Sequence, residues 1–215
     1  MPSLLSRLRR TRWATLCIIN LRFLIGFAFL PAALKKILDQ PFTDPANTGR
    51  FHDFLHAFHA TGWFYQFVGI TQLVAALLLC TQRFALLGAL IALPVLTAIT
   101  AFCWSTGVIP TATVATLMWL GTLALLIWDV DRWRGVLGLS STTPTLEPSP
   151  VALGRWSACG LAIITLYVGV CLAHGGIYRP RGMDLGSPAF YVLPAIALLP
   201  LVTLALDVRA RRRSS

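Results

Sequence analysis

The chain has 215 residues, of which 56% are hydrophobic and only 12% are charged. This composition is typical of membrane-embedded proteins and excludes a soluble domain built around one apolar core. The net charge of +10 comes mostly from short basic groups between apolar segments. That placement favours contact with lipid headgroups and argues against nucleic acid as a partner.

Six segments are apolar and long enough to cross a bilayer, because a spanning helix needs about 20 mostly apolar residues. They are residues 13–34, 63–80, 84–103, 111–128, 156–174 and 189–206. Tight turns connect the segments from the second to the fourth. We therefore predict an all-α membrane protein, made of an antiparallel four-helix transmembrane bundle plus a C-terminal transmembrane helical hairpin.

The chain divides into three regions. Residues 1–136 form the predicted four-helix membrane unit, and residues 137–153 are rich in Ser, Thr and Pro, as in a linker. Residues 154–215 form the predicted two-helix hairpin with a basic tail, and Pro194 and Pro200 are expected to interrupt its second helix.

Basic residues are unevenly distributed between the two sides of the predicted membrane protein. Twelve of them precede the first span, follow the last, or lie in the two connections on that same side, whereas five lie on the opposite side. Loops rich in Lys and Arg stay in the cytoplasm. We expect a multi-pass protein in contact with the lipid bilayer, with both termini and the linker in the cytoplasm.

The first span contains an arginine, Arg22, with Asn20 before it and Gly26 one turn later. Charged residues inside spans usually face the bundle interior and mark a site, and glycine allows a neighbouring helix to approach closely. If the span begins at Trp13, Arg22 lies about 13 Å along the helix. If it begins nearer Cys17, Arg22 can reach the headgroups as an anchor. Both alternatives stay open.

Gln72 in the second span is expected at a depth similar to that of Arg22. No acidic residue lies in the core of a predicted span, and Asp129 and Asp207 follow or end spans, so Arg22 has no obvious carboxylate partner. An arginine beside amides suits a carbonyl- or anion-bearing ligand such as a quinone headgroup. The candidate ligand site is therefore Arg22, Gln72, Asn20 and Gly26, and no catalytic residue is identified.

A short amphipathic helix is predicted over residues 50–60, in the connection between the first two spans. His52, His56 and His59 are spaced to lie on one face of it. Three imidazoles could bind a transition metal or hold a proton near neutral pH, and His174 could complete such a set. The alternative is a polar flank beside a phenylalanine stripe.

That stripe consists of Phe51, Phe54 and Phe58, together with Leu55. It is expected either in the outer headgroup region or against the mouth of the bundle. Lys35 and Lys36 end the first span at the same side. They could anchor the helix to lipid phosphate or close a polar cavity from above.

The first 135 or so residues resemble the DoxX/DoxD-type family of small bacterial integral membrane proteins. The resemblance rests on Arg22-x-x-x-Gly26, Lys35-Lys36, Gly69-Ile70-Thr71-Gln72 and Thr81-Gln82-Arg83-Phe84-Ala85, within four tightly connected spans. It implies a location in the bacterial inner membrane. The family often has a glutamate where this chain has Gln72, and this difference removes an ionisable group.

Three functions follow as hypotheses. The resemblance implies a membrane subunit or accessory of a quinone-linked redox assembly, with a quinone as the candidate cofactor and a redox subunit as partner, rather than a self-sufficient enzyme. The alternative is a membrane transport protein for a small solute or a metal, with His52, His56 and His59 at its outer mouth. A non-catalytic membrane scaffold is the third hypothesis, and homo-oligomerisation is compatible with each.

Overall fold

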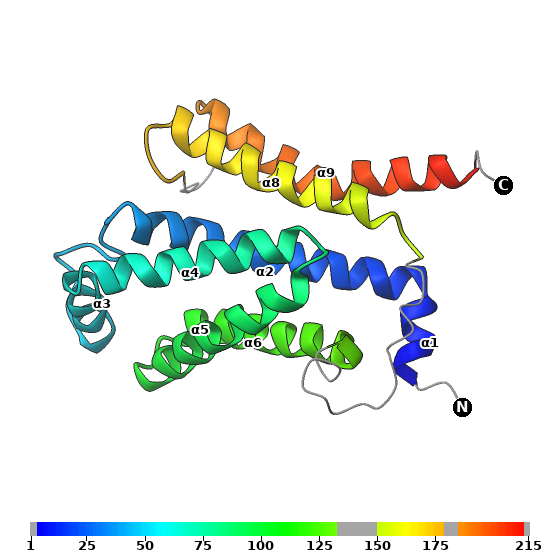
Figure 1. Ribbon diagram of the computed structural model, residues 1–215. Coiled ribbons are helices and arrows are strands. Elements are labelled where there is room, and N and C mark those ends of the chain that lie inside the picture. The colour runs from blue at the N-terminus through cyan, green and yellow to red at the C-terminus, as the bar shows by residue number, and fades with distance from the viewer. Residues whose placement is uncertain (1–3, 133–149, 179–184, 213–215) are drawn as a thin grey trace.

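The computed structural model describes residues 4–132, 150–178 and 185–212 (Figure 1). The described part is helical and contains no β-strand. Its helices are α1 (Leu4–Arg10), α2 (Arg12–Ile37), α3 (Arg50–Ala60), α4 (Trp63–Cys80), α5 (Ala85–Ser105), α6 (Ile109–Trp128), α8 (Leu153–Ala173) and α9 (Pro188–Arg212). Most of the predicted linker, residues 137–153, lies outside the described residues.

The six predicted spans are confirmed: α2, α4, α5, α6, α8 and α9 are each long and apolar enough to cross a membrane. Two details differ from the prediction. The first span is longer than expected, with 26 residues. α9 continues through Pro194 and Pro200 instead of breaking there, because a proline removes one backbone bond and membrane helices tolerate that loss.

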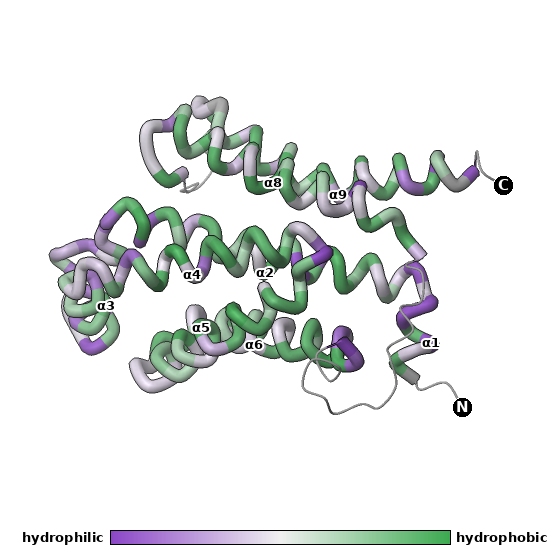
Figure 2. The backbone as a smooth tube through the Cα atoms, in the orientation of Figure 1, coloured by the Kyte–Doolittle hydropathy of each residue, from purple (hydrophilic) through white to green (hydrophobic). Residues whose placement is uncertain are grey.

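The spans run antiparallel between two chemically different ends (Figures 1 and 2). We call the end that contains α1, the turn at Gln82, Asp129 and the last turns of α9 the basic end. The opposite end, which contains α3, is the loop end. Hydrophilic residues gather mainly at these two ends (Figure 2), as expected for helices that cross an apolar layer.

The four-helix unit, α2 with α4, α5 and α6, is packed through glycines. A Cβ atom added at Gly69 of α4 would lie 2.6 Å from the Lys36 Cβ atom of α2, and one at Gly26 would lie 3.0 Å from the Cys80 sulfur atom. At Gly88 of α5, it would lie 2.8 Å from the Leu79 backbone nitrogen of α4. A Cβ atom would clash at Gly69 and Gly88 and would be tight at Gly26, so glycine allows these helices to approach closely.

The hairpin α8–α9 attaches to this unit mainly through α8. A Cβ atom at Gly160 would lie 2.4 Å from the Cys80 carbonyl oxygen, and the Ser157 hydroxyl donates a hydrogen bond to the Thr81 carbonyl over 2.5 Å. Much less of α9 is buried. In its most apolar stretch 11% of the residues are buried, compared with 50% in that of α2. α9 is therefore a peripheral helix, held at the side of the bundle.

Candidate functional site

Arg22 is buried and forms an ion pair at the basic end. Its Nη2 atom lies 2.8 Å from the Asp129 carboxylate, and its Nη1 atom donates to the Gln82 side-chain oxygen over 3.1 Å. Arg22 as a whole is only 5% exposed. The prediction that Arg22 lacks a carboxylate partner is therefore wrong, because Asp129 directly follows α6 and reaches the depth of Arg22.

Gln72 does not face Arg22. Gly26 packs against Ala76 and Cys80, so Arg22 is level with the turn that follows α4. Gln72 lies about ten residues before Gln82, roughly 15 Å away along a helix. The prediction of a shared depth is wrong because α2, with 26 residues, projects beyond the 18-residue α4 at the basic end.

The Gln72 side chain is enclosed in the four-helix unit and only 1% exposed. Its oxygen atom has no hydrogen-bond partner among the described residues. The four predicted ligand-site residues are thus divided: Arg22 is ion-paired, Gln72 is in the core, and Gly26 is a helix contact. Asn20 is exposed on α2.

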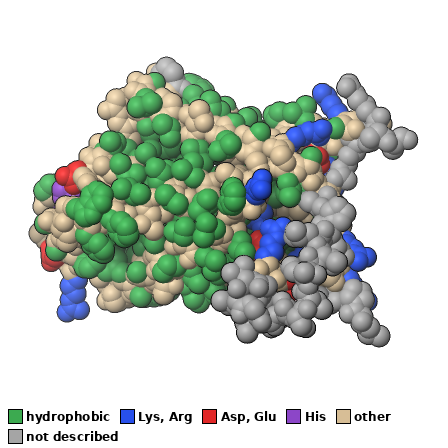
Figure 3. All heavy atoms as spheres, viewed as in Figure 1, with side chains coloured by type: hydrophobic (Ala, Val, Ile, Leu, Met, Phe, Trp, Pro, Cys, Tyr) green, Lys and Arg blue, Asp and Glu red, His purple; other side chains and the backbone are tan. Residues whose placement is uncertain are grey.

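Further ion pairs tie the helices together at the basic end, where basic side chains gather in Figure 3. Asp207 of α9 lies 3.2 Å from Arg12 of α2 and 3.6 Å from Arg155 of α8, and Arg9 pairs with Asp131. Sequence reasoning missed these pairs. Their signal was an aspartate at the end of an apolar span, beside arginines at the start of others.

The three histidines of α3 bind the preceding loop instead of converging on one point. The Nδ1 atom of His52 is 2.6 Å from the Thr43 hydroxyl, and the Nε2 atoms of His56 and His59 lie 3.2 and 3.0 Å from the carbonyl oxygens of Asp44 and Asp39. Within the described residues, no group of three His, Cys, Asp or Glu side chains could hold a metal ion.

His174 belongs to the hairpin, where the centre of its ring lies 5.2 Å from the centre of the Tyr178 ring. The structure therefore shows a loop-fixing role for His52, His56 and His59, and it does not assemble them into the candidate metal site.

The phenylalanine stripe of α3 packs on the bundle mouth, which was one of its two predicted positions. The centre of the Phe102 ring of α5 lies 4.3 Å from the centre of the Phe54 ring and 5.2 Å from the centre of the Phe51 ring. Lys36 is buried, and its Nζ atom lies 4.6 Å from the centre of the Phe42 ring. α3 and the preceding loop thus cover the loop end of the four-helix unit.

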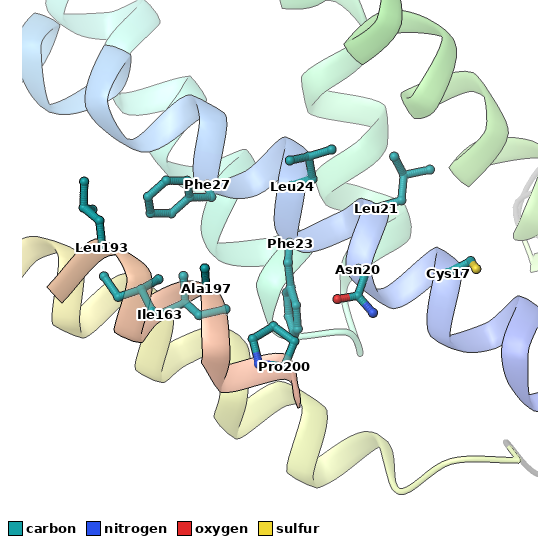
Figure 4. A pocket seen from close by; sticks show the side chains of 11 residues that line it. Cys17, Asn20, Leu21, Phe23, Leu24, Phe27, Ile163, Leu193, Ala197 and Pro200 are labelled. Carbon is teal, nitrogen blue, oxygen red and sulfur yellow. The ribbon is translucent and has the colours of Figure 1, made fainter. Parts of the chain in front are cut away.

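A groove lies between α2 and the hairpin, mainly along α9, and has a volume of about 630 Å³ (Figure 4). This volume is within the usual range for small-molecule sites, about 300–1,000 Å³. It is lined by Cys17, Asn20, Leu21, Phe23, Leu24, Phe27, Ile163, Leu193, Ile196, Ala197 and Pro200. Asn20 is thus the one predicted ligand-site residue that lines this groove.

The groove lining is apolar except near Asn20 and Cys17. The Asn20 amide nitrogen donates to the Leu16 carbonyl over 2.9 Å, and its oxygen lies on the side of Phe23 and Pro200 in Figure 4. In a membrane this arrangement can hold an apolar chain with one polar group at its end.

Comparison of the chain with protein-family models, curated proteins and solved structures finds no match in any of the three. The resemblance of the first 135 residues to the DoxX/DoxD-type family therefore stays a prediction, and the function has to be argued from the geometry.

Proposed function

We propose that this chain is a membrane-embedded accessory subunit that holds a membrane-soluble carrier of the quinone class in the groove between α2 and the hairpin. The observation that carries the proposal is the groove itself, with its volume of about 630 Å³ and its apolar lining. A carrier with an apolar side chain can reach such a site directly from the lipid, because the groove lies at the side of the bundle.

Because Arg22 is already ion-paired, we place the proposed ligand in the groove beside Asn20, and not beside Arg22 as expected from the sequence. Arg22 is held by Asp129 and Gln82, and a ligand would have to replace contacts that offset the cost of a buried charge. Asn20 lines the groove and keeps its proposed role. Phe23 and Phe27 supply aromatic surface against which a flat ring can pack.

The redox part of the proposal comes from the family resemblance. In this proposal the protein lies in the bacterial inner membrane with both termini in the cytoplasm, as its charge distribution favours, and it acts beside a redox partner subunit. A membrane assay tests this part: quinone-dependent electron transfer is measured in membranes with and without the chain. Equal rates would contradict the accessory role.

The groove is tested by binding of a decyl-substituted benzoquinone to the full chain in lipid nanodiscs. Ala197→Trp places a large side chain in the groove, whereas Ala195→Trp changes an exposed α9 residue outside its lining. We expect at least about tenfold weaker binding for Ala197→Trp, because it occupies the space of the ligand, and no change for Ala195→Trp. Absence of binding to the wild type, or equal binding by both variants, overturns the proposal.

A further inference from the structure

Two prolines interrupt the backbone hydrogen bonding of α9 without ending the helix. Proline has no N–H group, so Pro200 cannot donate to the Ile196 carbonyl, and Pro194 cannot donate to the Phe190 carbonyl. Each of these carbonyls therefore loses its α-helical donor. In the apolar layer of a membrane there is little water to replace a lost donor, so such a carbonyl favours any donor that can reach it.

Only one of these two positions borders the groove. Pro200 and Ile196 both line it, whereas Pro194 and Phe190 do not (Figure 4). The ring of a helical proline lies against the carbonyl four residues earlier. Since the Pro200 ring lines the groove, the Ile196 carbonyl lies on the same side of α9.

The facing wall, formed by α2, supplies a second acceptor. One N–H of the Asn20 amide donates to the Leu16 carbonyl, and the side-chain oxygen of Asn20 can accept hydrogen bonds. The groove therefore presents acceptor oxygens on both walls, from Asn20 on α2 and Ile196 on α9. A ligand that matches them must bring donors.

We propose that the groove selects a hydroxyl-bearing headgroup and so binds a quinol in preference to the corresponding quinone. The two carriers share ring and tail, but only the quinol has O–H donors for the Ile196 carbonyl and the Asn20 oxygen. This inference rests on the proposed function, because it concerns the headgroup of the same ligand. It involves binding alone and assigns no electron transfer to this chain.

The test compares the affinities of the reduced and oxidised forms of one probe, a decyl-substituted hydroquinone and benzoquinone, for the full chain in nanodiscs without oxygen. We expect the wild type to bind the reduced form about tenfold more tightly, the usual scale of one or two hydrogen bonds. Pro200→Ala restores the N–H group that bonds to Ile196, and it should lower this ratio to about three, because the Asn20 oxygen remains as an acceptor.

Pro194→Ala is the matched control, since it makes the same change in the same helix away from the groove, and it should keep the wild-type ratio. Both variants favour helix formation, and the ratio cancels changes that affect both probe forms equally. Asn20→Leu should lower the ratio as well, by removing the acceptor of the other wall.

The outcomes separate this inference from the proposed function. Binding of neither probe form overturns the proposed function. Equal affinities of the wild type for both forms leave the groove as a carrier site but overturn the headgroup preference. An equal fall of the ratio in Pro200→Ala and Pro194→Ala would assign the effect to the shape of α9, and this result would also overturn it.

Discussion

The four-helix unit and the C-terminal hairpin are built from similarly apolar helices but pack in different ways. Within the four-helix unit, backbones meet at Gly26, Gly69 and Gly88. The hairpin meets the unit through α8 at Gly160 and Ser157, while little of α9 is buried. The groove lies along this second, looser contact, so its volume arises where packing is incomplete.

Connection lengths explain part of this difference. α5 begins soon after α4 ends, and α6 begins soon after α5 ends. Turns this short place consecutive helices side by side in antiparallel orientation. The hairpin instead follows residues 133–149 and is positioned by contacts between residues far apart in sequence, such as Arg12 with Asp207.

The largest expected effect is at the ion pair inside the four-helix unit. Arg22→Leu leaves the Asp129 carboxylate, which is 7% exposed, without its closest basic partner. We expect the free energy of unfolding to fall by about 3 kcal/mol, because an uncompensated buried charge is costly. Unfolding in detergent mixtures, followed by circular dichroism, measures the change.

The double variant Arg22→Leu with Asp129→Leu is the control for this prediction. Removal of both charges should recover part of the lost stability, since apolar side chains can replace a buried ion pair. A double variant less stable than Arg22→Leu alone would show that the Asp129 carboxylate does not depend on Arg22.

The contact between the two regions is broken by Gly160→Leu. Its side chain would clash with the Cys80 carbonyl and the Phe23 ring, and we expect a loss of about 2 kcal/mol, the usual scale for overpacking. Gly169→Leu is the matched control in the same helix, where an added Cβ meets nothing within 4 Å. Equal thermal stability of the two variants would contradict close packing of α8 on the bundle.

The attachment of α9 is tested by Asp207→Asn. Removal of this buried charge weakens the ion pairs with Arg12 and Arg155, and we expect α9 to open more easily by about 1 kcal/mol. Amide hydrogen exchange along α9 should become faster. Asp131→Asn is the control: it changes an aspartate whose side chain is 54% exposed, and it should have little effect. Equal rates of hydrogen exchange along α9 in the two variants would refute the role of Asp207.

The smallest expected effect is at the loop end of the four-helix unit, where the histidines of α3 bind the preceding loop. His59→Ala removes one contact to the Asp39 carbonyl, and it should raise hydrogen exchange in residues 39–44 with a global cost of about 1 kcal/mol or less. His174→Ala, on the hairpin, should leave this loop unchanged. A rise in melting temperature with added Zn²⁺ that is lost in His59→Ala would instead favour the metal hypothesis.

Sequence patterns alone were enough to identify the spans and the loop helix. Residues 50–60 and 63–80 match α3 and α4 in the structure. Gly62, which has a positive φ of 58°, separates them, and glycine adopts that conformation without strain. Hydropathy, helical periodicity and glycine turns are local signals, and local signals are read directly from a sequence. The close helix contact at Gly26 was predictable for the same reason.

Only the tertiary structure decided which polar groups meet. Asp129 is 107 residues from Arg22 in sequence, and their pairing depends on how far α2 projects beyond α4 and where α6 ends. A sequence shows the depth of each residue within its own helix, but not the offset between helices. That offset brings Arg22 to Asp129 and Gln82 instead of Gln72, and the loose packing of α9 places Asn20 opposite Pro200 in the groove.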